Sequence, residues 1–507
     1  MVERTSVSAE PEELLHRRRL DRADFLRLLG AGAGLAMFHT SLAASAGAQE
    51  ALSGIPALSP DGEYPIGIWW PPPPDPPPEK TLAEYYAERY AEIAAAGFNF
   101  VIGGNGVVND TSNPPALQAA ADSGLRFLLT DARLRNLIRD GSGTIQASSL
   151  EKSSPSIMQS LPEQEGPEFR TAAVSGDEVT QRVQELVATY STYPAFAGIN
   201  IYDEPETSQF GLVNAAEDEL RTSSSEDLPY INVWPSYASA GALGAMDYRT
   251  YLERYFDRIN PPLLSFDHYP LLAGTKITGS YFYNWAVIRN FALRFGVPSM
   301  VFIQSVGFNG SEVGLANRRR PSRQEILWQA NVSLAYGAKG IKYFTYWTPE
   351  AQPSPSIRFG EALISRTGDP TTLYYDAQQV NGYLKVVGKV LLPLVSESVV
   401  HARERRLPMG ARPFRRDGYV REVSGSPVIL SRFFDAATTE RYLFVVNRSF
   451  ANVARTRLRM GGAVSKVSGL NMTTGEFDPA RLEGRPRRDL PMKIAPGAAR
   501  LYLLHKA

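Results

Sequence analysis

Eight short apolar segments, separated by stretches with helical periodicity, recur between residues 64 and 347 and constrain the fold more than any other feature. Strands that alternate with helices predict a parallel sheet, because each helix returns the chain to the start of the next strand. The expected strands span residues 66–70, 98–102, 125–129, 196–202, 230–234, 263–266, 299–303 and 340–345. The expected helices span residues 81–96, 177–190, 248–258, 283–295 and 323–337.

Eight strand–helix units in about 285 residues favour a closed (β/α)8 TIM barrel. An open, doubly wound sheet is the alternative, but no G-x-G-x-x-G motif follows the first strand to mark a dinucleotide site. A proline-rich run over residues 71–78 is expected to form a stiff loop at the mouth of the barrel. Residues 141–170, rich in Ser, Pro and Gly, predict a long loop after the third strand.

The sequence changes character after residue 375. A helix over residues 376–392 leads into short strands with turn signals between them, a pattern typical of an all-β sandwich. From His401 onward about 21 Lys and Arg stand against about 9 Asp and Glu, which we interpret as complementary docking on an acidic barrel rather than polyanion binding. The expected parts are an export signal over residues 1–50, a barrel over 60–375, a connecting helix within 376–399 and a sandwich over 400–507.

The first fifty residues have the organisation of a bacterial export signal. Three arginines at residues 17–19 precede a short apolar run over residues 28–38, and A-x-A sites follow between residues 44 and 48. Residues 22–27 are similar to a twin-arginine signal, except that Ala23 replaces the second arginine. We therefore expect a secreted, periplasmic or cell-surface protein with no integral membrane segment in the mature chain. The alternative interpretation is a disordered amphipathic tail.

The amino-acid composition excludes several kinds of catalytic and binding chemistry. Cysteine is absent, which excludes disulfides, thiolate zinc sites, iron–sulfur clusters and cysteine nucleophiles, and the five histidines do not favour a metal centre or a Ser–His–Asp triad. Lys plus Arg equals Asp plus Glu at 53 each, so no overall basic charge favours a nucleic-acid partner. Neither a metal nor an organic cofactor is implied. Carboxylates, amides and aromatic rings are left to carry the chemistry.

Acidic, amide and aromatic side chains follow the carboxyl ends of the expected strands, where functional groups of such barrels lie. Four of the six tryptophans are among them. Indole faces pack on the apolar faces of sugar rings, and paired carboxylates are what glycoside hydrolysis requires. The candidate residues are Trp69, Trp70, Asn105, Asp131, Asp203, Glu204, Trp234, Asp267, His268, Tyr269, Gln304 and Trp347.

The segment I-N-I-Y-D-E-P, residues 199–205, resembles the strand-four N-E-P signature of clan A glycoside hydrolases. The segment over residues 324–347 is similar to barrels of the β-galactosidase type. The motifs V-N-R-S, T-G-E and P-G-A near the end of the chain resemble β-sandwich domains appended to such barrels. The resemblance covers roughly residues 64–350 and implies a glycoside hydrolase acting on a carbohydrate, with Glu204 as general acid/base.

Two positions depart from the family pattern. Asp203 stands where the signature has Asn, and Gln304 follows the seventh strand, where the family has its nucleophilic Glu. A retaining mechanism with a strand-seven glutamate is therefore not supported.

Three alternatives remain open. The first is substrate assistance, as in glycoside hydrolase families 18 and 20, with Glu204 as acid, Asp203 orienting a 2-acetamido group and Tyr269 hydrogen-bonded to it. The second is an inverting pair of Glu204 and Asp267, two strands apart, at the spacing of roughly 6.5–9.5 Å that admits a water molecule. The third is carbohydrate binding without cleavage on a degenerate barrel.

Each candidate also has a structural interpretation. Glu204, followed by Pro205, suits the start of a helix, and Asp267 suits a helix cap or an arginine pair. His268 is interpreted as a hydrogen-bonding wall residue rather than a base, and Gln304 as a sugar contact or a loop amide. The tryptophans suit a core as well as a sugar subsite. We expect an enclosed site in which burial and the neighbouring Asp203 raise the pKa of Glu204.

Overall fold

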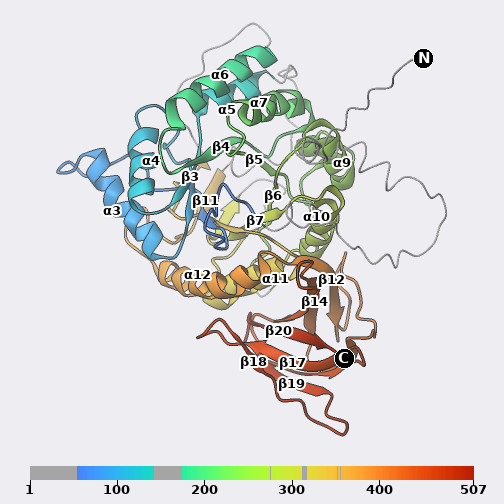
Figure 1. Ribbon diagram of the computed structural model, residues 1–507. Helices are drawn as coiled ribbons and strands as arrows, with labels where there is room; N and C mark the ends of the chain where they lie inside the picture. Colours follow the sequence, from blue (N-terminus) through green and yellow to red (C-terminus); the bar gives the residue numbers. More distant parts are fainter. Residues whose placement is uncertain (1–53, 142–173, 275, 311–316, 351, 354–355) are drawn as a thin grey trace, which may run out of the picture. The chain divides into compact units, whose positions relative to one another are not determined.

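The computed structural model describes residues 54–141, 174–274, 276–310, 317–350, 352–353 and 356–507 (Figure 1). The export-signal prediction and nearly all of the loop predicted over residues 141–170 lie outside these residues.

Eight parallel strands form a closed barrel, which confirms the predicted fold class. Each strand pairs with its neighbours in chain order, and the last strand pairs with the first to close the ring. All eight lie within two residues of the expected positions. They are β1 (Ile66–Ile68), β2 (Phe100–Ile102), β3 (Arg126–Leu129), β4 (Phe196–Asp203), β5 (Leu228–Val233), β6 (Leu264–Asp267), β7 (Ser299–Gln304) and β9 (Ile341–Phe344).

Helices surround the strands (Figure 1). Several begin at the side-chain caps that the sequence provides; Thr81, for example, forms a capping box with Glu84 at the start of α3. Four helices, α4, α5, α7 and the short α8, add to those expected. The helices up to the end of the barrel are α3 (Leu82–Ala95), α4 (Asn113–Asp122), α5 (Ala132–Asp140), α6 (Gly176–Tyr190), α7 (Phe210–Ser223), α8 (Ala240–Leu243), α9 (Tyr248–Arg258), α10 (Tyr281–Phe295) and α11 (Arg323–Ala335).

Strand β4 is irregular where it approaches the site. Gly198 has a φ of 131°, and a Cβ atom there would lie 2.1 Å from the carbonyl oxygen of Leu228, so only glycine fits against β5. The β4–β5 register then shifts between Asn200 and Tyr202. Such bulges re-aim side chains at the rims of barrels, and this one precedes the last residue of β4, Asp203.

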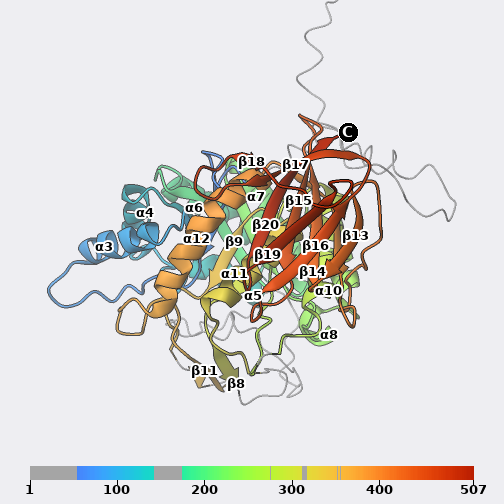
Figure 2. The same ribbon diagram turned by 90° about the horizontal axis from the view of Figure 1, so that it is seen from below.

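The segments after β7 and β9 form a small antiparallel sheet that the sequence did not predict. Its strands are β8 (Phe308–Gly310), β10 (Gln352–Pro353) and β11 (Ser356–Phe359). Strands β8 and β11 lie side by side in Figure 2. Because these segments leave the carboxyl ends of barrel strands, the sheet lies on the side of the barrel where the candidate residues lie, and Phe308 contacts the ring of Tyr269 at 5.8 Å.

Two antiparallel sheets follow helix α12 (Thr372–Leu391). Apolar side chains from both, such as Val445 and Leu458, share a core, as expected for a sandwich. The larger sheet contains β12 (Val395–Ala402), β14 (Val428–Phe434), β15 (Arg441–Asn447), β20 (Ala499–Lys506), β17 (Val464–Leu470) and β18 (Phe477–Pro479). The smaller contains β13 (Val420–Gly425), β16 (Ala454–Met460) and β19 (Asp489–Ile494).

The barrel and the sandwich belong to one compact unit and contact each other mainly through aromatic and backbone groups. The Asn331 amide donates to the carbonyl of Gly497 at 2.9 Å. Arg448 lies over the ring of Phe282 at 4.6 Å, while its ion pair is with Glu404 inside the sandwich. These contacts do not require the charge complementarity that we inferred from the sequence. No helix in the described part of the chain has the length and apolar character needed to cross a membrane.

Candidate active site

Three carboxyl side chains meet at the carboxyl ends of β4 and β6. Asp203 ends β4, Glu204 follows it, and Asp267 ends β6. Glu204 and Asp267 are 4% and 2% exposed and hydrogen-bond to each other, whereas Asp203 is partly exposed. The structure therefore brings together the three residues that the sequence predicted as catalytic.

Glu204 has an unusual backbone conformation. Its φ is 53°, in the left-handed region that glycine favours, and its N–H donates to the carbonyl of Asn232 at 2.7 Å. Helical structure starts only at Thr207, with Glu206 as the N-cap residue. Glu204 thus does not begin a helix, and the capping interpretation of this residue is wrong.

The environment of the carboxyl pair shifts the pKa of Asp267. Burial raises this pKa to about 6, against the opposing effects of hydrogen bonds from Glu204 and Asn232 and of the charge of Lys342. Burial and the charge of Asp267 also raise the pKa of Asp203 well above its usual value. Because a carboxylate can only accept hydrogen bonds, Glu204 and Asp267 must share a proton. The site therefore holds a proton donor and a base side by side.

The contact between Glu204 and Asp267 bears on the inverting alternative. Inverting glycosidases keep their carboxyl groups roughly 6.5–9.5 Å apart so that a water molecule fits between catalyst and sugar. A direct hydrogen bond leaves no such space. The geometry of this structure does not fit an inverting pair.

Several buried donors near the strand ends have no hydrogen-bond partner in the described part of the chain. Among them are the Tyr269 hydroxyl and the Trp234 indole N–H. Burial raises the pKa of the Tyr269 hydroxyl well above its usual value, and the charges of Asp267, Glu204 and Asp203 add to this shift, so the hydroxyl lies near the carboxyl groups. A buried donor without a partner is destabilising, so these groups are suited to bind the hydroxyl or amide oxygens of a ligand.

His268 is a wall residue. Its two ring nitrogens hydrogen-bond to Asn284 Oδ1 at 2.8 Å and to Thr278 Oγ1 at 2.7 Å. Burial lowers its pKa to about 3, so the ring is neutral near pH 7. With both nitrogens occupied, His268 shapes the site and is not available as a base.

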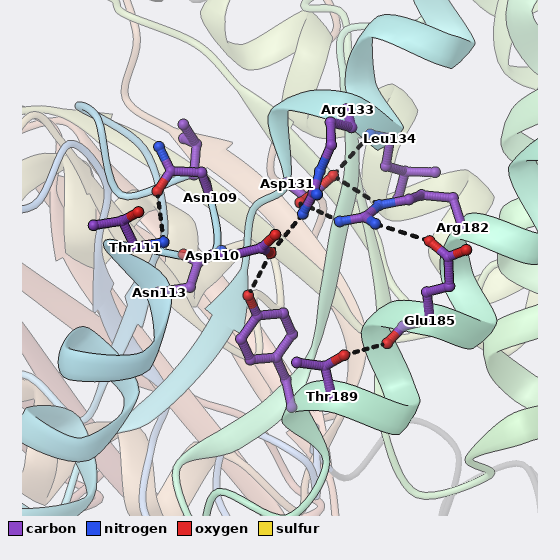
Figure 3. Close-up of polar contacts among 12 residues, drawn as sticks. Asn109, Asp110, Thr111, Asn113, Asp131, Arg133, Leu134, Arg182, Glu185 and Thr189 are labelled. Atoms are coloured by element: carbon purple, nitrogen blue, oxygen red, sulfur yellow. Dashed lines mark hydrogen bonds and ion pairs between the residues drawn. The ribbon is translucent and has the colours of Figure 1, made fainter.

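Asp131 has a structural role, which corrects its assignment as a substrate-binding residue. It caps α5 by accepting a hydrogen bond from the Leu134 N–H at 3.0 Å. Arg182 and Arg133 pair with it at 2.8 and 3.1 Å, as Figure 3 shows. The carboxylate is fully buried among these partners. An acid that follows a strand also precedes the next helix, and there it can cap the helix N-terminus.

Gln304 also has a structural role, and its assignment as a sugar contact is wrong. Its Oε1 accepts from the Leu271 N–H at 2.9 Å, and its Nε2 donates to the Arg319 carbonyl at 2.7 Å. The side chain is completely buried. Gln304 is therefore an amide that joins the loops after β6 and β8.

The aromatic candidates line the ends of β1 and β9 but retain little exposed surface. Trp69 donates its indole N–H to the Gly103 carbonyl at 3.2 Å, and Trp70 contacts the Trp69 ring edge-on at 4.9 Å. Trp347 packs against the Arg89 guanidinium at 5.6 Å. All three tryptophans are 6–8% exposed, so in this structure they act chiefly as core aromatics.

Asn105 supports the proline-rich loop. Its Nδ2 donates to the Pro71 carbonyl at 2.7 Å, and its φ of 53° is left-handed. The amide therefore holds the segment after β1 in place, and the structure shows no contact between Asn105 and the carboxyl groups of the site.

A set of polar residues inside the barrel was not predicted from the sequence. Lys342 on β9 is fully buried and contacts Tyr230 and Ser265. The signal was present, because a charged residue inside a buried parallel strand requires partners. In the described part of the chain, no group of three or more His, Asp or Glu residues is arranged to hold a metal ion.

The strand pairing defines the chain as a (β/α)8-barrel protein with C-terminal antiparallel sheets. No family model and no curated protein matches it. Among solved structures, it is similar to a family 39 glycoside hydrolase from Bacteroides cellulosilyticus (TM-score 0.45, 12% identity, 88% of this chain and 82% of that one). It is also similar to a family 5 glycoside hydrolase from Bacteroides vulgatus (TM-score 0.49, 12% identity, 87% and 88% coverage).

Proposed function

We propose that the protein is an exported glycoside hydrolase in which Glu204 donates a proton to the leaving oxygen of a carbohydrate. The observation that carries this proposal is the buried, hydrogen-bonded pair of Glu204 and Asp267 at the carboxyl ends of barrel strands. Glycoside cleavage needs a protonated and an ionised carboxyl group at one place, and two carboxyl groups sharing one proton supply both.

Substrate assistance fits the geometry better than inversion. In this mechanism Glu204 protonates the leaving oxygen, and the acetamido oxygen of the substrate attacks the anomeric carbon. Asp203, whose pKa is raised, lies next to Glu204 and orients the acetamido group. The hydroxyl of Tyr269, which has no partner within the described residues, is a suitable donor to the acetamido oxygen.

The test is turnover of aryl glycosides that include plain hexosides, pentosides and 2-acetamido sugars. We expect Glu204→Gln to lower turnover by about 10²–10⁴-fold, because it removes the proton donor while preserving shape. Glu206→Gln, two residues further on and partly exposed, is the matched control and should retain activity. Equal activity of wild type and Glu204→Gln would overturn the assignment of Glu204.

The class of sugar that is cleaved shows whether Asp203 or Asp267 is the second catalytic carboxylate. Release from 2-acetamido sugars alone, abolished by Asp203→Asn, supports substrate assistance. Release from sugars with a plain 2-hydroxyl, abolished by Asp267→Asn, instead assigns Asp267 as the second catalytic carboxylate. An endo-acting enzyme ignores small aryl substrates, so polysaccharides complete the panel.

A second candidate function is carbohydrate binding without cleavage. The position of Gln304 favours it, because the strand-seven nucleophile of clan A is replaced by an amide that is committed to backbone groups. This alternative predicts that a polysaccharide binds without being cleaved and that Glu204→Gln leaves the affinity unchanged.

A further inference from the structure

A chain of hydrogen bonds leads from a buried lysine to the carboxyl pair. Lys342 Nζ donates to Tyr230 Oη at 2.5 Å and also to Ser265 Oγ. Ser265 Oγ donates to Asn232 Oδ1 at 2.8 Å, and Asn232 Nδ2 donates to Asp267 Oδ1 at 3.1 Å. The chain therefore joins β9, β6 and β5 and ends at Asp267, which hydrogen-bonds Glu204; the Asn232 side chain also hydrogen-bonds Asp203.

The direction of these bonds follows from the lysine. Lys342 Nζ donates to Ser265 Oγ, so the serine oxygen accepts from the lysine. The single hydroxyl proton of Ser265 then points to the Asn232 oxygen, which turns the Asn232 NH₂ group toward Asp267. With the amide held this way, Asp267 receives a donor, and a donor favours the ionised carboxylate.

We propose that Lys342 is a positioning residue that acts through Ser265 and Asn232 to keep Asp267 ionised and Glu204 protonated. The effect of this positioning on catalysis rests on the proposed function. Lys342 itself does not reach the substrate, because its side chain is fully buried inside the barrel, against Tyr230 and Ser265. Through this network the barrel interior sets which member of the carboxyl pair carries the proton.

Lys342 is enclosed by groups from four neighbouring strands. Burial lowers the pKa of Lys342 well below its usual value, and the charges of Asp267 of β6 and Asp203 of β4 oppose this shift. Tyr230 of β5 and Phe302 of β7 present their rings to the ammonium group, with Phe302 at 3.9 Å. The carboxylates and the rings therefore favour the charged form of Lys342, which burial by itself disfavours.

A purely structural lysine is the competing explanation, and the chain offers a matched control for it. Lys339 is also buried and lies three residues earlier. Its Nζ donates to the carbonyls of Leu391, Leu392 and Leu394 at 3.0, 2.7 and 2.5 Å. Because Lys339 lies just before β9 and contacts backbone carbonyls at and after the end of α12, its loss affects stability without reaching Asp267.

The experiment uses the full-length chain with ¹³C-labelled aspartate and follows the carboxyl carbon of Asp267 by NMR over a pH titration, assigned with Asp267→Asn. We expect Lys342→Met and Ser265→Ala each to raise the pKa of Asp267 from about 6 by about one unit or more. Lys339→Met should lower the melting temperature and leave the titration of Asp267 unchanged. If a substrate is found, the pH–rate profiles should move in parallel.

If Lys342→Met does not fold, Ser265→Ala decides alone, because it breaks the same chain and keeps the lysine. Folded variants in which Asp267 titrates as in the wild type overturn the proposal. If neither the wild type nor any variant cleaves a glycoside, a shifted titration still supports the positioning role, and only the proposed function fails.

Discussion

Acidic residues at strand ends have two different roles in this barrel. Asp131 caps a helix and pairs with Arg182, which lies in α6, 51 residues later in the chain. Asp267, the last residue of β6, pairs with another acid. The sequence around each residue is alike, an apolar strand followed by an acid. Only the partners brought by folding distinguish them, so a list of strand-end acids could predict the catalytic candidates but not select among them.

The buried, neutral imidazole of His268 leads to a prediction about how the free energy of unfolding depends on pH. Its folded-state pKa of about 3 lies below the unfolded value of about 6.5, so the unfolded chain binds more protons and stability falls as pH falls through this window. Between about pH 5.5 and pH 4, His268→Gln should reduce the slope of unfolding free energy against pH by about 1.4 kcal/mol per unit. Urea unfolding of both proteins measures this slope, and equal slopes would contradict the buried neutral imidazole.

The strands were easier to predict than the helices for a physical reason. A buried parallel strand is a short apolar run, which is visible without its neighbours. Helix α4 begins N-P-P, and prolines that suit a first helical turn also signal a loop. The polar interior was missed because Lys342 lies inside an apolar strand, where sequence periodicity alone does not say which partners it meets.

At the level of elements, Gln304 joins β7 to two loops. We expect Gln304→Glu to destabilise the protein by about 1–3 kcal/mol, because a carboxylate would face the carbonyls of Leu271 and Arg319. The substitution should not create a strand-seven nucleophile. Gln378→Glu on α12 is the control, since that exposed amide also donates to a carbonyl, that of Ala95. Chemical denaturation compares the two, and similar losses would sink this explanation.

At the level of the whole molecule, the barrel and the sandwich should unfold together. Apolar residues of β14, β15 and β20 belong to the same core as the barrel, and Asn331 bonds to Gly497 across the junction. Calorimetry should therefore show one transition. Asn331→Ala, which removes a buried hydrogen bond, should lower the midpoint temperature of this transition by an amount equivalent to about 1–3 kcal/mol. The unfolding should remain a single transition. Two resolved transitions would show that the sheets fold independently.

The left-handed backbone of Glu204 has a consequence for how the chain can evolve. Glycine adopts this conformation without strain, whereas a glutamate held there carries a penalty of about 1–3 kcal/mol. Selection for thermal robustness alone would thus replace this residue with glycine or asparagine and lose the carboxyl group. If related proteins keep glutamate at this position despite its cost to folding stability, that retention would indicate selection for the chemistry of the carboxyl group.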